Sequence, residues 1–100
     1  MHDAHTPSSE STLRDTVAAL MRATGETQAD LGSGLRLSQG QVSRKQGGAS
    51  SWSLDDVDRL SAHYGIPVPD LLCGPTHALT KLDPRRRAAT LGGTQTTIGG

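Results

Sequence analysis

The sequence predicts an all-α fold, with five short helices in one compact domain between flexible N- and C-terminal tails. Three features support this fold class. Apolar residues recur every three or four positions from Leu13 onward, as on the buried face of a helix. Four segments begin with Ser or Thr followed three residues later by Asp or Gln, a pattern typical of helix N-termini. Hydrophobic residues make up 33% of the 100 residues and aromatic residues 2%, which suits one small aliphatic core.

The first helix is expected to begin near Ser11 or Thr12, with Thr12 and Asp15 as its capping pair. Gly25 should end it by adopting a left-handed conformation. Its buried stripe is predicted to consist of Leu13, Val17, Leu20 and Met21. Residues 1–10 show no apolar period, so we expect a disordered arm followed by a domain spanning residues 11–74.

Two short helices are predicted next, and a corner of about three residues at 36–38 separates them. The first opens at Thr27, with Asp30 completing a capping box. Its inward side chains should be Leu31 and Leu35, which lie one turn apart.

The second helix of this pair opens at Ser38 and has Gln41 in the reciprocal capping position. Leu37 before the cap and Val42 after it form a predicted hydrophobic staple. Two short helices joined by so tight a corner are a helix-turn-helix motif.

The outward face of the second helix carries polar side chains and no acidic residue. With Val42 turned inward, the outward residues are Gln39, Gly40, Gln41, Ser43 and Arg44. Glutamine can pair with adenine, arginine with guanine, and serine with either base. Such a face fits a DNA major groove; the alternative is an ordinary solvated polar surface.

A fourth helix is predicted from the segment SWSLDDVDRLSAHYG. Ser53 and Asp56 should cap it, Trp52 and Val57 should form its staple, and Gly65 should end it. Its expected inner stripe is Leu54, Val57, Leu60 and Tyr64. Pro69 can then begin a last short helix whose Leu71 and Leu72 close the core.

Three further side chains have modest interpretations. Trp52 could lie against a DNA backbone, but a staple residue with its N–H directed outward is the preferred reading. Cys73 is expected to be a small core filler, and as the only cysteine it fits a reducing cytoplasm. His63 is expected to be solvated. His2 and His5 lack companion ligands, so no metal site, cofactor or catalytic constellation is predicted.

Residues 75–100 are predicted to form a basic, largely flexible tail with a short helix over 84–91. Its run of Arg85, Arg86 and Arg87 could contact phosphates, stay solvated or contribute to a dimer surface, and these three interpretations remain open.

The net charge of the chain is zero, but its charges are unevenly distributed. Residues 27–48 hold three basic residues and one acid, whereas residues 53–74 hold one basic residue and four acids. A neutral molecule of this kind can still present a positive face to phosphate. We expect no membrane span, no leader segment and a cytoplasmic protein, associated with the nucleoid when bound to DNA.

From about Leu13 to Gly74 the chain resembles the lambda-repressor-like (Cro/Xre) DNA-binding domain. The residues that carry the resemblance are Thr27-Gln28, Leu31, Ser38, Val42-Ser43-Arg44, Gly48, Leu60, Tyr64-Gly65-Ile66 and Asp70-Leu71-Leu72. The resemblance implies that the third helix, at about 39–46, reads bases with Gln39, Gly40, Ser43 and Arg44. It also implies a phosphate contact for Gln28, next to the helix N-terminus at Thr27. Arg36, Gln41 and Lys45 are further candidates for phosphate contacts.

The sequence departs from the family pattern at several positions. Gly32 and Gly34 lie inside the second helix, where each costs about 0.8–1 kcal/mol relative to alanine. Arg36 stands at the corner, where the family has glycine, and would need a left-handed or strained backbone unless the turn differs. The family often pairs a basic residue late in helix one with a glutamate late in helix three, but these positions hold Met21 and Gln46.

The expected function is that of a sequence-specific DNA-binding transcriptional regulator, in a prokaryotic setting, that represses by occupying an operator. A homodimer on half-sites about 34 Å apart is the favoured assembly. The alternative is a non-enzymatic protein-interaction module that binds another regulator with the same fold.

Overall fold

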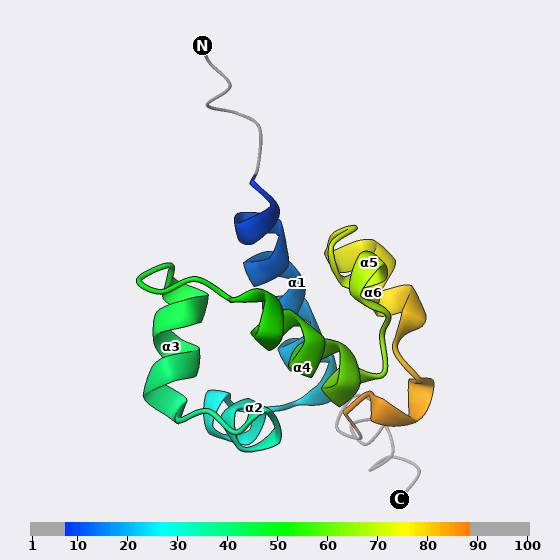
Figure 1. Ribbon diagram of the computed structural model, residues 1–100. Coiled ribbons are helices and arrows are strands. Elements are labelled where there is room, and N and C mark those ends of the chain that lie inside the picture. The colour runs from blue at the N-terminus through cyan, green and yellow to red at the C-terminus, as the bar shows by residue number, and fades with distance from the viewer. Residues whose placement is uncertain (1–7, 89–100) are drawn as a thin grey trace, which may run out of the picture.

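The computed structural model describes residues 8–88, and every regular element in that range is a helix (Figure 1). The α-helices are α1 (Ser9–Thr24), α2 (Gln28–Leu35), α3 (Gln39–Gly47), α4 (Leu54–Tyr64), α5 (Val68–Leu71) and α6 (Pro75–Lys81), and a 3-10 helix, η2, spans Pro84–Arg86. The all-α prediction is confirmed, with six α-helices in the described residues instead of the five expected. None of these helices combines the length and hydropathy needed to cross a bilayer.

Helix α1 runs through the middle of the molecule and divides its neighbours into two groups (Figure 1). Helices α2 and α3 pack against each other on one side, and α5 and α6 lie on the other. The core between them is mainly aliphatic, and its most deeply buried side chains are Val17, Leu20, Leu31, Leu35, Val42, Leu60, Tyr64, Ile66 and Leu71. The buried stripes predicted for α1 and α2 are therefore largely as expected, with Met21 only partly buried.

Helix α1 begins earlier than the sequence suggested. Its N-cap is Ser8, whose hydroxyl accepts a hydrogen bond from the Ser11 amide at 2.9 Å. Thr12, the expected cap, lies inside the helix. Ser8 offers the same capping oxygen one turn earlier, so the helix can extend toward the N-terminus. Residues 1–7 of the predicted arm, with His2 and His5, lie outside the described residues.

The segment predicted as a flexible tail contains a packed helix. Helix α6 lies against α1 and buries Ala78, while Leu82 just beyond it is 4% exposed. The helix expected over 84–91 is present only as η2, and residues from 89 onward lie outside the described range. The apolar positions of α6 are too few to show a helical period, so its packing surface was not recognised.

Two leucines predicted to be buried are exposed. Leu54 is 85% exposed and Leu72 43% exposed, whereas Trp52, next to the α4 cap, is buried. Cys73, expected to fill the core, is also exposed. A periodic pattern locates the apolar side of a helix, but it does not show where the neighbouring elements stop covering that side.

Candidate nucleic-acid interface

The corner between α2 and α3 depends on a left-handed residue, Arg36, and on a close backbone contact at Gly32. Arg36 adopts the left-handed conformation with φ 63°, the only non-glycine residue in 8–88 with a positive φ. The Leu37 amide donates to the Gly32 carbonyl at 2.8 Å, so the chain folds back onto α2. A Cβ on Gly32 would lie 2.6 Å from the Leu37 carbonyl oxygen. Gly32 is therefore required by the corner, and this close approach explains a glycine inside a helix.

The start of α3 is fixed by a capping box and by the buried side chain of Val42, as the sequence predicted. Ser38 and Gln41 form a reciprocal capping box, with distances of 2.8 and 3.1 Å. Val42 is completely buried, and Leu37 packs against the same core. Because its cap and its anchor are both fixed, α3 presents its remaining face in a defined orientation.

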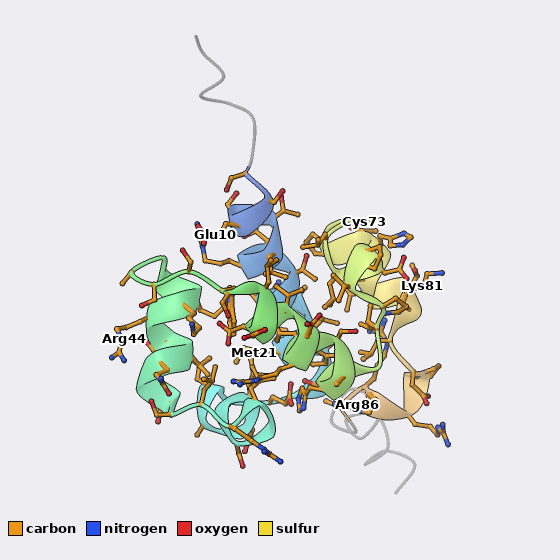
Figure 2. All side chains as sticks on the ribbon, viewed as in Figure 1. Glu10, Met21, Arg44, Cys73, Lys81 and Arg86 are labelled. Atoms are coloured by element: carbon orange, nitrogen blue, oxygen red, sulfur yellow. The ribbon has the colours of Figure 1, made fainter. Side chains whose placement is uncertain are left out.

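The outer face of α3 is exposed. Gln39, Gly40, Ser43 and Arg44 are all exposed, and Figure 2 shows the Arg44 side chain pointing away from the molecule. Arg44 forms no ion pair within residues 8–88. A Cβ on Gly40 would meet the Arg44 guanidinium only at 3.5 Å, an ordinary contact distance, so the fold does not require this glycine. The four predicted base-reading residues thus share one exposed surface, which we call the α3 face.

The candidate phosphate contacts fall into two groups. Thr27 and Arg36 are exposed, Gln28 is partly buried, and Gln41 is exposed although its side-chain oxygen caps α3. Thr27 caps α2 through its capping box with Asp30. These four residues lie in or next to α2 and at the start of α3, and α2 packs against α3 (Figure 1).

Lys45 differs from the other candidates because its charge is used inside the protein. Its ammonium lies 2.8 Å from a carboxylate oxygen of Asp56 and 3.0 Å from the Ser51 carbonyl. The two charged side chains are 15% and 6% exposed. Burial raises the pKa of Asp56, but hydrogen bonds from Lys45 and Ser53 outweigh burial and hold the pKa below its usual value. Lys45 therefore connects α3 to α4. Because Asp56 neutralises the Lys45 ammonium, this charge is not available to a phosphate.

Gln46 joins three elements through its amide. It accepts a hydrogen bond from the Trp52 indole N–H at 2.9 Å and donates to the Arg14 carbonyl at 3.1 Å. The expectation that the Trp52 N–H points outward was wrong, because the ring is 6% exposed and its polar atom needs an internal partner. Gln46 therefore links α3 to α1 and to the segment before α4 through an amide that both donates and accepts.

A second polar region lies at the junction of α1 and α2, and it was missed in the sequence. Glu26 accepts hydrogen bonds from the Tyr64 hydroxyl at 2.7 Å and from Thr24 at 3.0 Å, and His63 lies 2.5 Å from its other oxygen. Arg86 donates to the His63 carbonyl at 2.8 Å and lies over the Tyr64 ring. We call these residues the Glu26 cluster. His63 is thus not merely solvated, and Arg86 fastens η2 to α4.

The charges of the Glu26 cluster are satisfied internally. Burial raises the pKa of Glu26, but the hydrogen bonds from His63, Tyr64 and Thr24 together outweigh burial and lower it. The same burial and the bond to Glu26 raise the pKa of Tyr64. Of the other two arginines in the basic run, Arg85 pairs with Asp83 at 2.6 Å and Arg87 is exposed.

A comparison with protein families gives a match over most of the chain. The family model described as the BetR domain matches residues 8–97, which is most of the chain and includes all of its described helices. No curated protein and no solved structure matches the chain.

Proposed function

The chain belongs to the BetR domain family, a family of small helical DNA-binding regulatory domains, and we propose from this membership that it is a sequence-specific transcriptional regulator. The observation that carries the proposal is the α3 face. It combines exposed amide, hydroxyl and guanidinium groups on a helix that is anchored by Val42 and carries no acidic residue.

In this proposal α3 enters the major groove. Arg44 pairs with a guanine, Gln39 with an adenine and Ser43 with either base, while Gly40 lets the helix approach closely. Thr27, Gln28, Arg36 and Gln41 contact phosphates and set the register of the helix on the duplex. Lys45 is left out of this set because it is paired with Asp56.

We further propose a lambda-repressor-like arrangement of the motif and repression by occupancy, in which the bound protein excludes polymerase from an operator. The chain would act on DNA in a prokaryotic cytoplasm and would have no enzymatic activity. One α3 helix reads only a few base pairs, so a homodimer on an inverted repeat is the assembly that supplies enough contacts.

Salt titration of binding to duplex DNA tests this proposal directly. A DNA-binding domain should lose affinity as salt rises, with a logarithmic slope of about −0.9 for each phosphate that it neutralises. Selection of bound duplexes from a random pool should then return a consensus, and a palindromic consensus would support the dimer. Absence of duplex binding at low salt would overturn the assignment.

A second candidate function is a protein-interaction module, and one surface favours it. An open apolar hollow of about 450 Å³ is lined by Leu13, Trp52, Leu54, Val57, Val68 and Leu72, with Glu10 and Asp58 among its polar lining residues. Leu54, one of these lining residues, is largely exposed. An apolar peptide segment carrying basic residues would match this hollow in both hydrophobicity and charge. Under this function, the wild-type chain would bind such a peptide and would have no affinity for duplex DNA. The substitution Leu54→Asp would abolish peptide binding.

A further inference from the structure

The turn between α5 and α6 brings together three side chains that are separated in the sequence. Asp70 lies in α5, Cys73 in the turn and His77 in α6. One ligand atom from each lies within 4.8 Å of the other two. The His77 Nε2 and a carboxylate oxygen of Asp70 are 2.7 Å apart. The sequence pattern did not reveal this group, because Cys73 was expected to lie in the core.

We propose that Asp70, Cys73 and His77 form a binding site for a zinc-like divalent cation. Thiolate, imidazole and carboxylate are the three ligand types that zinc accepts in proteins. With metal–ligand bonds of about 2.0–2.3 Å, tetrahedral ligands lie roughly 3.5 Å apart, so small side-chain rotations suffice to close the site. Water takes the fourth position, because the site is open to solvent.

The backbone under these three residues is held in place. Each ligand directly precedes a buried residue: Asp70 precedes Leu71, Cys73 precedes Gly74, and His77 precedes Ala78. Leu71 and Ala78 are completely buried. Gly74 has a φ of 110°, a conformation open mainly to glycine, and α6 begins directly after it and packs against α5. The three ligands are therefore fixed on one exposed side of a packed unit, which lowers the entropy cost of binding a cation.

Binding of the cation displaces protons from its ligand atoms. The Cys73 thiol loses its proton to solvent, and the hydrogen bond between His77 Nε2 and the Asp70 carboxylate is replaced by bonds from both atoms to the cation, with the imidazole proton on Nδ1. Without the metal, His77 and Asp70 make an ordinary surface pair and the thiol takes no part. The involvement of Cys73 therefore separates the two situations.

The proposed site is remote from the α3 face. Helices α5 and α6 lie across α1 from α3, and Figure 2 shows Cys73 and Arg44 on opposite sides of the molecule. The cation would clasp α5 to α6, which packs on α1, without covering the DNA-reading residues. The proposal is thus independent of DNA recognition.

Titration of the full chain with Co²⁺, a spectroscopic substitute for zinc, tests the site. We expect a thiolate-to-cobalt charge-transfer band in the near ultraviolet, visible bands of a tetrahedral ion, and loss of both when Zn²⁺ is added. Cys73→Ser should abolish the charge-transfer band. His77→Ala and Asp70→Asn should each weaken binding at least about tenfold, since even outer-shell partners of a metal change affinity about 10–100-fold.

The double variant His2→Ala/His5→Ala is the matched control and should bind cobalt like the wild type. Zinc should also raise the melting temperature of the wild type but not of Cys73→Ser, because a cation that binds only the folded chain stabilises it. Absence of the charge-transfer band in the wild type would overturn the proposal, as would equal cobalt affinity in the wild type and His77→Ala. A melting temperature of metal-free Cys73→Ser equal to that of the metal-free wild type would show that the variant is folded.

Discussion

The α3 face and the Glu26 cluster are both polar, but they differ in whether their side chains have hydrogen-bond partners inside the protein. In the Glu26 cluster each polar side chain has a partner in the protein, and Glu26 accepts from Tyr64 and Thr24 while His63 lies against it. On the α3 face the side chains are exposed, and Arg44 has no ion-pair partner in residues 8–88. The same contrast separates two adjacent residues, because Lys45 is paired internally and Arg44 is not.

This difference shows how polar groups divide between folding and binding. A polar side chain whose partners lie within the protein contributes to stability, and its loss leaves another group unsatisfied. One that stays exposed contributes little to stability and is available to a ligand. Substitutions in the two regions should therefore affect different measurements.

The largest effect is expected for Lys45→Ala. Removal of the ammonium leaves Asp56 charged and buried without its partner, which should lower the free energy of unfolding by about 3 kcal/mol. Urea denaturation measures this loss, with Arg44→Ala as the neighbouring control, expected to change stability by less than about 0.5 kcal/mol. If Lys45→Ala instead kept its stability and reduced the salt slope of DNA binding by about 0.9, Lys45 would be a phosphate contact after all.

Glu26→Ala should lower the free energy of unfolding by about 2 kcal/mol, because Tyr64 and His63 lose a charged hydrogen-bond partner in a partly buried site. Glu10→Ala is the matched control. Glu10 lies 3.8 Å from Arg14 on the surface, so its removal should cost less than about 0.5 kcal/mol. Equal denaturation midpoints for the two variants would show that the Glu26 cluster adds no stability.

The Glu26 cluster and the Lys45–Asp56 pair together predict how stability depends on pH. The pKa values of Glu26 and Asp56 lie below their usual values of 4.5 and 3.8 in the folded protein, so the unfolded chain binds protons first as the pH falls. Their stabilising contribution is present above pH of about 5 and should be lost in more acidic solution. Urea midpoints measured between pH 6 and pH 3 should fall less steeply for Glu26→Gln than for the wild type, and parallel curves would contradict this account.

Arg44→Ala tests the other side of the comparison. It should weaken binding to the preferred duplex by about 1–3 kcal/mol and relax the preference at one base pair, while leaving stability almost unchanged. Binding to a randomised duplex library measures both effects. The same sequence preference in mutant and wild type would remove Arg44 from the set of base-reading residues.

The smallest effect is expected for Gln28→Ala. Loss of one neutral hydrogen bond to phosphate should weaken binding to all duplexes alike by about 1 kcal/mol and leave the salt slope unchanged, since no charge is removed. A loss confined to one duplex sequence would mean that Gln28 reads a base.

The parts of the fold that the sequence predicted correctly involve residues close together in the chain. The capping boxes at Thr27, Ser38 and Ser53 each join residues three positions apart, so the sequence alone identifies them. The burial of Val42 follows from helical spacing in the same way. These local features also predicted which residues form the α3 face.

The features that the sequence did not reveal involve residues brought together by packing. His63 and Glu26 are 37 positions apart, and Lys45 meets Asp56 only because α3 lies beside α4. The exposure of Leu54 and Cys73 likewise depends on where neighbouring helices end. The sequence by itself determined α2, α3 and α4, their capping boxes and the residues exposed on α3, because those depend on interactions within a turn or two. Only the tertiary structure decided which charged groups are neutralised inside the protein, because that depends on the distances between helices.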